Sequence, residues 1–140
     1  MARQAEAEWK GDLKGGSGRV KLGSGAYEGS YSFASRFEDG AGTNPEELVG
    51  AALTGCFSMA LANSLATAGF AATSVHTTAA VHLGKDDKGF LINLIELTVD
   101  AVVPKIDDTT FQQHVEKTKA GCIVKRALAS VPTTVKATLT

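Results

Sequence analysis

The longest apolar stretch of the chain runs from Thr43 to Gly69 and predicts one long helix. Asn44 is a favourable N-cap, Pro45 suits the first helical position, and Glu47 completes a capping box. Almost no polar face remains beyond this start, so we expect the helix to be buried on all sides. About 25 residues would span roughly 35–40 Å, which is longer than a domain of this size needs. We therefore expect a second subunit to cover part of the helix.

Short alternating segments separated by glycine-rich turns fill the chain before this helix. Residues 5–9, 19–22 and 30–33 alternate between polar and apolar, which predicts antiparallel strands in a meander. The segment that joins the last of these strands to the helix contains Arg36. This arginine is close enough in sequence to fold back toward the start of the helix.

The pattern after the helix predicts two strands, a helix, a short helix and a last strand. These elements are expected at residues 72–83, 90–103, 107–119, 122–129 and 133–139. A polar hairpin connection joins the first two of them. This order is typical of an α+β fold with antiparallel sheets and with the helices on one side. We expect a single domain over residues 1–140.

Composition narrows the possible partners and the compartment. A formal net charge of −1 over 140 residues gives no basic surface for nucleic acid or for an anionic membrane. The N-terminal segment is polar and acidic where a secretory signal is apolar, and the apolar core of the long helix looks too short to span a membrane. We therefore predict a cytoplasmic protein. Its two cysteines, Cys56 and Cys122, are then reduced thiols, and any bond between them is redox-active rather than structural.

These cysteines are the strongest candidates for a nucleophile. The chain has no P-loop, no Rossmann glycine pattern, no G-x-S-x-G motif and no zinc-binding cysteine cluster. A reactive thiolate needs a positive neighbour or a helix N-terminus. Cys122 follows Gly121 at the start of a predicted helix, so from position alone it is the more acidic thiol. Cys56 lies within an apolar helix and, by itself, is more simply an inert core cysteine.

Arg36 and Glu46 could change that assignment. Glu46 lies ten residues before Cys56, about 15 Å along a helix, so it cannot contact that thiol. It could instead hold the Arg36 guanidinium in a bidentate fork and leave other N–H donors for a thiolate or a peroxide oxygen. Without further knowledge, the simpler interpretation is a solvated surface pair.

The segment SRFEDGAGTNPEELVGAALTGCFSMAL, followed downstream by KAGCIVKRAL, closely resembles the OsmC/Ohr family of organic hydroperoxide reductases. The similarity covers essentially the whole chain. It is closest to the OsmC (osmotically inducible protein C) branch, because RFEDG-x-GTNPEEL precedes the first cysteine and GC-x-V precedes the last helix. The resemblance implies an intertwined homodimer with the long helices at its centre and the sites at the subunit interface, which agrees with the excess length of the helix.

The resemblance also implies a thiol peroxidase that acts on organic hydroperoxides in oxidative or osmotic stress. Cys56 would attack the peroxide and become a sulfenic acid, Arg36 would stabilise its thiolate, and Glu46 would position Arg36. Cys122 would then resolve the sulfenic acid as a Cys56–Cys122 disulfide. A dithiol such as a lipoylated protein would reduce that disulfide, with no metal, haem or flavin. This assignment reverses the order of acidity that position alone suggests.

Two other functions stay open. One is a dimeric protein that binds an apolar small molecule at its interface, with both cysteines inert, because the fold alone does not define an activity. The other is a cysteine hydrolase, although no histidine stands in a recognisable motif. The histidines are interpreted as strand-face or surface residues rather than metal ligands: His76, His82 and His114. Five apolar residues are expected to be mainly core, with some lining a pocket for bulky hydroperoxides: Leu48, Leu53, Phe57, Phe37 and Phe33.

Overall fold

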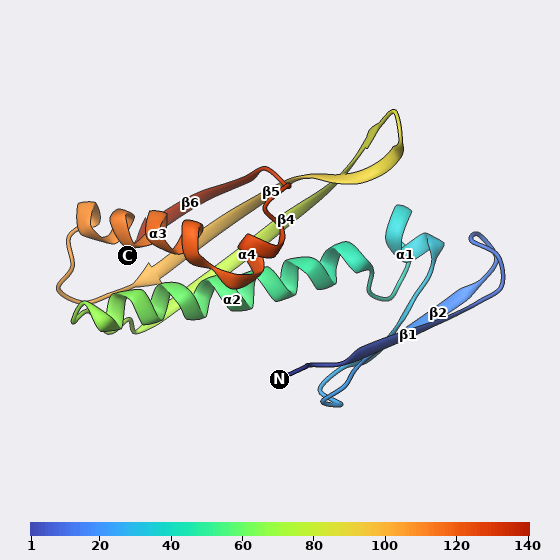
Figure 1. Ribbon diagram of the computed structural model, residues 1–140, viewed down its shortest axis with the longest axis horizontal. Coiled ribbons are helices and arrows are strands. Elements are labelled where there is room, and N and C mark those ends of the chain that lie inside the picture. Colours follow the sequence, from blue (N-terminus) through green and yellow to red (C-terminus); the bar gives the residue numbers. More distant parts are fainter. The chain divides into compact units, whose positions relative to one another are not determined.

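The computed structural model describes residues 1–140 and contains a strand meander, a long helix, a hairpin, two further helices and a last strand (Figure 1). This arrangement confirms the predicted α+β class. The chain forms two compact units, Met1–Leu48 and Val49–Thr140. A single domain over the whole chain stays a prediction.

The sheet of the first unit is a three-stranded antiparallel meander, as the alternation predicts. Its strands are β1 (Ala5–Lys10), β2 (Ser17–Leu22) and β3 (Glu28–Tyr31), and they pair in sequence order. Gly25 in the turn between β2 and β3 has a φ of +79°, a conformation that side chains with a Cβ rarely adopt. The glycine-rich segments therefore serve as the turns of this sheet.

A short helix that the sequence did not indicate follows this sheet. It is α1 (Phe33–Phe37), and Ser32 is its N-cap. The Ser32 hydroxyl accepts the N–H of Ser35 at 3.1 Å, and the Ser35 hydroxyl accepts the N–H of Ser32 at 2.8 Å. The prediction that Phe33 ends a strand is therefore wrong. A capping box of two serines begins a helix where the alternation alone continues a strand.

The long helix α2 (Pro45–Thr67) starts and ends as predicted. The Asn44 side chain accepts the N–H of Glu47 at 2.8 Å, which is the expected N-cap bond. The other half of the predicted capping box does not form, because the Glu47 carboxylate accepts the Thr43 hydroxyl at 2.7 Å instead. Gly69 adopts a φ of +91° just beyond the last turn, the usual conformation of a helix stop.

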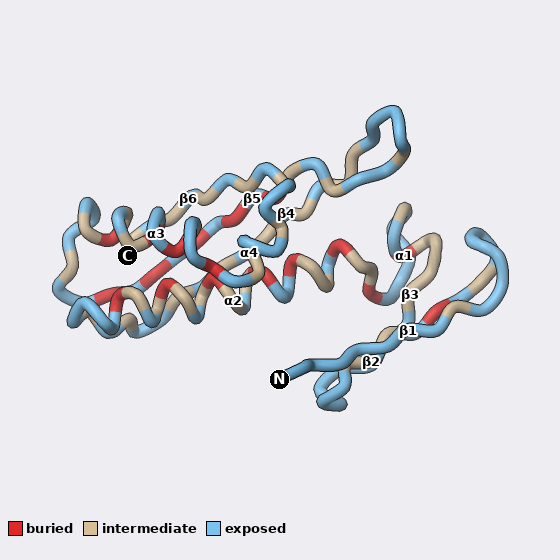
Figure 2. Tube along the Cα trace, in the orientation of Figure 1, coloured by how far each residue is buried: buried red, intermediate tan, exposed pale blue.

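One stripe of α2 is buried, rather than its whole surface. Its fully buried side chains recur every fourth residue: Leu53, Phe57, Leu61 and Leu65. Figure 2 shows these buried positions alternating along the helix with exposed ones, and Met59 is 76% exposed. Within the single chain, α2 is therefore not buried on all sides. Cover by a second subunit stays a prediction.

By length and composition, α2 is apolar enough to cross a membrane. The prediction that its apolar core is too short is therefore wrong. A helix in the core of a protein passes the same test, and the buried stripe of α2 belongs to one hydrophobic cluster with the strand that follows the hairpin turn. In this fold the apolar side chains of that stripe build the core of the second unit.

The sheet of the second unit is mixed. β4 (Ser74–Asp86) and β5 (Gly89–Val102) form the predicted antiparallel hairpin, whereas β6 (Thr133–Leu139) pairs with β5 in parallel. The prediction of purely antiparallel sheets is therefore wrong for the last strand. Two helices lie between β5 and β6, and a connection of that length can return the chain to the end where β5 begins.

The helices of the second unit cover one face of this sheet, as predicted. Between residues 95 and 103, odd-numbered side chains are buried and even-numbered ones are exposed, so only one face of β5 is covered (Figure 2). The connecting helices are α3 (Asp108–Gly121) and α4 (Ile123–Ala127). Asp107 caps α3 by accepting the N–H of Thr110 at 2.7 Å.

Candidate functional site

The two cysteines meet in the second unit. Cys56 lies in the middle of α2, and Cys122 is the residue between α3 and α4, where it caps the end of one helix and the start of the next. The Cys122 thiol donates to Cys56 Sγ at 3.2 Å, and both residues are free thiols. A disulfide needs sulfurs about 2.05 Å apart, so a small movement would join them. The structure thus brings together the two predicted cysteines from distant parts of the sequence.

The backbone at Cys122 explains how its sulfur reaches α2. The Cys122 N–H still donates to the Thr118 carbonyl at 2.8 Å, as the last bond of α3. The residue then leaves the helical conformation, with φ −57° and ψ 126°, and its carbonyl accepts the N–H of Arg126 at 2.9 Å as the first bond of α4. This single non-helical residue separates the two helices at the point where the thiol meets Cys56.

The start of α4 places main-chain donors on Cys56. The N–H of Val124 donates to Cys56 Sγ at 3.5 Å. Burial raises the pKa of the Cys56 thiol, but the bond from Val124 acts against it. The Cys122 thiol and the main chain of Ile123 donate further bonds, and the net result is a Cys56 pKa below its ordinary value. Donors of this kind stabilise a thiolate more than a thiol, so the site favours ionisation of Cys56.

The pKa of Cys122 is shifted in the opposite direction. Burial raises it, because only 1% of the residue is exposed. The N–H of Lys125 lowers the pKa, but the hydrogen bond and the charge of Cys56 raise it further, and the net shift is upward. The prediction that Cys122 is the more acidic thiol is therefore wrong. The helix N-terminus that begins beside Cys122 also donates to the sulfur of Cys56, which the sequence could not reveal.

We expect iodoacetamide to alkylate Cys56 before Cys122 in the reduced, folded protein. Alkylation needs the thiolate, and Cys56 has the lower pKa and the greater exposure. Peptide mass mapping at several pH values should show Cys56 labelling with a midpoint below that of an unperturbed cysteine, because the hydrogen bonds at its sulfur lower its pKa. In a Cys56→Ser control, Cys122 should label slowly until the protein is unfolded. Faster labelling of Cys122 in the parent protein would contradict these assignments.

Arg36 and Glu46 form a bidentate ion pair in the first unit. Arg36 Nε donates to Glu46 Oε1 at 3.1 Å and to Oε2 at 3.3 Å, and Arg36 Nη2 donates to Oε1 at 2.8 Å. The Glu46 side chain is only 11% exposed and that of Arg36 is 38% exposed, so this is not a freely solvated pair. Arg36 Nη1 makes no hydrogen bond in the structure. The predicted fork therefore forms and leaves N–H donors for a further group.

Hydrogen bonds across the segment between α1 and α2 hold the two partners together. The Ser35 hydroxyl donates to the Thr43 carbonyl at 2.7 Å, and the Asn44 amide donates to the Ser35 carbonyl at 3.0 Å. Ser35 and Thr43 are both buried. These bonds tie the end of α1, which carries Arg36, to the first turn of α2, which carries Glu46.

Aromatic side chains gather beside this ion pair. They line a hollow of about 240 Å³, with Arg36 at its wall: Trp9, Leu13, Tyr31, Ser32, Phe33, Arg36 and Phe37. The rings of Phe33 and Phe37 lie 5.0 Å apart, and Arg36 Cζ lies 5.4 Å from the centre of the Phe37 ring. Phe33 and Phe37 thus line an apolar pocket, one of the outcomes that the sequence allowed. Trp9 and Tyr31 could not be predicted as pocket residues from the sequence, because alternation assigns them only to strands.

The histidines do not approach either cysteine. His82 Nε2 lies 2.6 Å from Glu96 Oε2 on the exposed face of the sheet, and His76 is exposed on the same face. His114 Nδ1 lies 2.8 Å from Ser64 Oγ. No group of three or more His, Cys, Asp or Glu side chains is arranged to hold a metal ion. The hydrolase alternative, which needs a Cys–His pair, has no support from this geometry.

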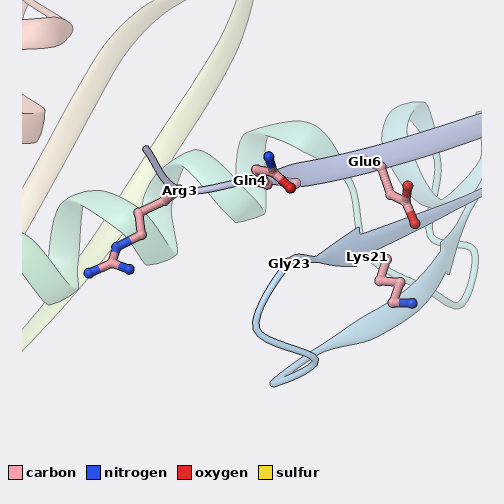
Figure 3. A pocket seen from close by; sticks show the side chains of 6 residues that line it. Arg3, Gln4, Glu6, Lys21 and Gly23 are labelled. Carbon is pink, nitrogen blue, oxygen red and sulfur yellow. The ribbon is translucent and has the colours of Figure 1, made fainter. Parts of the chain in front are cut away.

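A larger hollow, of about 510 Å³, lies at the edge of the first sheet (Figure 3). Gln4, just before β1, and Glu6 in β1 line it, together with Lys21 in β2 and Gly23 in the turn that follows. Glu6 and Lys21 are direct partners in the register of β1 and β2. The hollow contains none of the predicted site residues, so it is separate from the candidate site.

The chain belongs to the OsmC-like protein family, which matches residues 38–136. That range contains both cysteines and Glu46, and Arg36 lies just before it. The resemblance that the two cysteine motifs carry is thereby confirmed.

Similar proteins cover nearly the whole chain. Peroxiredoxin OsmC of Escherichia coli K12 is 49% identical over 127 residues, which are 90% of this chain and 89% of that protein. Among solved structures, an organic hydroperoxide resistance protein from Elizabethkingia anophelis has a TM-score of 0.71 and 25% identity, covering 100% of this chain and 97% of its own. An OsmC-like protein of unknown function from Vibrio cholerae has a TM-score of 0.79 at 15% identity, covering 99% of each chain, and shows the shared fold alone.

Proposed function

We propose that this protein, a thiol-dependent peroxidase, reduces organic hydroperoxides to alcohols with Cys56 and Cys122. The observation that carries the proposal is the 3.2 Å contact between the two sulfurs, with the Val124 N–H donating to Cys56 Sγ at 3.5 Å. The names of two similar proteins support it, because one is called a peroxiredoxin and the other an organic hydroperoxide resistance protein.

Cys56 is the residue that reacts with the hydroperoxide. Its thiolate attacks the distal oxygen of ROOH, the O–O bond breaks, and the alkoxide leaves and takes up a proton to become the alcohol ROH. Cys56 then carries the distal oxygen as a sulfenic acid. The main-chain donors of α4 and the lowered pKa of Cys56 support this role, since only the thiolate is an effective nucleophile.

Cys122 is the resolving residue. Its sulfur attacks the sulfenic sulfur of Cys56, a disulfide forms, and the sulfenic oxygen leaves as water. The charge of the Cys56 thiolate is one reason why the pKa of Cys122 is raised. That charge disappears when the sulfenic acid forms, so the resolving thiol ionises more readily after the first step than before it. An external dithiol, such as a lipoylated protein, then reduces the disulfide by thiol–disulfide exchange, with no metal, haem or flavin.

Arg36 supplies the cation in this proposal, and Glu46 holds it. The guanidinium would stabilise both the Cys56 thiolate and the departing oxygen of the peroxide. Support comes from the fork, which occupies Nε and Nη2 and leaves Nη1 without a hydrogen-bond partner. The aromatic hollow next to Arg36 would accept the organic group of the substrate, because its walls are mainly apolar rings.

The same proposal includes an intertwined homodimer that works in the cytoplasm during oxidative or osmotic stress. The exposed side of α2 supports the dimer, since Met59 and several small residues there have no cover within the second unit. A long helix with an uncovered apolar side is the kind of surface that a second subunit buries.

Stopped-flow kinetics with the reduced protein test the proposed substrate class. We expect cumene hydroperoxide to be consumed faster than hydrogen peroxide by about tenfold or more, the scale of discrimination that apolar pocket contacts supply. The free thiols should fall by two per chain in the same experiment. Equal rates for both peroxides would contradict a role for the aromatic hollow. Thiols that survive both peroxides would instead favour the ligand-binding alternative.

A further inference from the structure

We propose that Ser64 and His114 are positioning residues that hold α3 at a fixed height along α2 and so keep Cys122 within reach of Cys56. Ser64 Oγ and His114 Nδ1 lie 2.8 Å apart, and both residues are partly buried. The inference rests on the proposed function, because it concerns how the disulfide closes. We call these two side chains the helix clamp.

The helix clamp and the two sulfurs mark the ends of one antiparallel pairing. Ser64 lies eight residues after Cys56 on α2, and His114 lies eight residues before Cys122 on α3. The two helices run in opposite directions (Figure 1). Equal spacing on two antiparallel helices means that one register satisfies both contacts at once. A shift of one helix along the other would break both.

Packing alone fixes this register weakly. The large apolar side chains that α3 buries are Phe111 and Val115, and a hollow of about 290 Å³ lies beside the helix clamp. Ala60 and Thr118, midway between the two contacts, line this hollow, so no large side chain fills the space beside them. Apolar contacts are not directional, whereas a hydrogen bond requires a defined distance and angle. The bond between Ser64 and His114 can therefore set the axial position that packing leaves free.

Hydrogen bonds along α3 connect His114 to the resolving cysteine. The Thr118 hydroxyl donates to the His114 carbonyl at 2.8 Å, and the Cys122 N–H donates to the Thr118 carbonyl at 2.8 Å. Thr118 is buried, so this connection is shielded from water. A displacement at His114 is therefore transmitted to Cys122 two turns later. Misplacing a reacting group by about 1 Å can slow a reaction by about 10²-fold.

Two variants remove the helix clamp, and a third retains part of it. We expect Ser64→Ala and His114→Ala to close the disulfide about tenfold more slowly after one equivalent of cumene hydroperoxide. Sulfenic acid should then accumulate on Cys56, where dimedone traps it. His114→Asn keeps a hydrogen-bonding atom at the position of Nδ1, so it should close faster than His114→Ala. Gln113→Ala, at an exposed position of α3, is the matched control and should behave like the parent protein.

A second readout does not depend on peroxidase activity. The disulfide is formed with diamide and equilibrated with a dithiothreitol redox buffer, which measures how well the fold holds the two sulfurs together. In Ser64→Ala and His114→Ala, we expect the equilibrium constant for disulfide formation to shift about tenfold toward the dithiol. The reason is that the fold would hold the two sulfurs less closely together.

The outcomes separate this inference from the proposed function. A parent protein that loses no thiols to the hydroperoxide overturns the proposed function. If the parent closes its disulfide and Ser64→Ala and His114→Ala close it equally fast, with an unchanged equilibrium, the positioning role is wrong. Variants that melt at a lower temperature but close at the parent rate would show a purely structural role and would also overturn it. Closure in His114→Asn no faster than in His114→Ala would contradict the role of the hydrogen bond.

Discussion

Replacing Cys56 by serine should abolish hydroperoxide consumption, whereas replacing Cys122 by serine should leave one full turnover per chain. In the proposed mechanism Cys56 is the nucleophile, because the donors of α4 lower its pKa, whereas the pKa of Cys122 is raised. Without the Cys122 thiol, the Cys56 sulfenic acid forms but cannot become the intramolecular disulfide. Single-turnover stopped flow measures the first step, and mass spectrometry after dimedone trapping measures the sulfenic acid.

The double variant Cys56→Ser/Cys122→Ser gives the background rate for this comparison. A serine at position 122 still offers a hydroxyl donor to Cys56, so the first step should stay close to the parent rate. Full single-turnover consumption by Cys56→Ser, or sulfenic acid found on Cys122, would contradict the roles of the two cysteines.

Replacing Arg36 by lysine should slow the peroxide step by about ten- to hundredfold although the charge is conserved. The guanidinium uses Nε and Nη2 to bind Glu46, and in the proposed mechanism Nη1 faces the reacting atoms. A single ammonium cannot hold Glu46 and face the sulfur or the peroxide in the same geometry. A hydrogen bond to a charged group contributes roughly 1.5–3 kcal/mol, which corresponds to a rate effect of this size. Stopped-flow measurement of the second-order rate constant with cumene hydroperoxide provides the comparison.

Arg19→Lys is the matched control for this prediction. Arg19 pairs with Glu28 at 3.4 Å in the same unit, but both side chains are at least half exposed. The same substitution there should leave the rate unchanged, because exposed ion pairs contribute little. An unchanged rate in Arg36→Lys would remove Arg36 from the mechanism. An equal fall of the rate constant in Arg36→Lys and Arg19→Lys would indicate a general effect of replacing arginine by lysine, not a specific role of the Arg36–Glu46 fork.

Most of the fold follows from local patterns in the sequence. Alternation located the meander and the hairpin, and Asn44 and Gly69 marked the two ends of α2. The direction of β6 could not be predicted in this way, because pairing with β5 depends on where α3 and α4 return the chain. What covers the remaining surface of α2 could not be predicted for a related reason. An apolar composition shows that a surface avoids water, but it does not show which part of the fold covers it.

For the candidate site, the sequence indicated which residues take part but not their acidities or all of their contacts. Residue types made the two cysteines and the Arg36–Glu46 fork candidates, and only the family resemblance gave them roles in one site. The structure contains both pairs. The acidity of the cysteines was misassigned from position. The N–H groups that follow Cys122 in sequence also donate to Cys56, and only the fold brings α4 against α2. No local pattern could reveal the bond between Ser64 and His114, because it joins two helices that a whole hairpin separates.

Peptide mapping of the protein after one equivalent of cumene hydroperoxide tests the central claim most directly. The account predicts the loss of two thiols per chain and a single new species, a disulfide between Cys56 and Cys122 of the same chain. Their sulfurs lie 3.2 Å apart before oxidation, so this bond should form before any other. Two intact thiols after the hydroperoxide is exhausted, or a disulfide only between different chains, would contradict the two-cysteine mechanism.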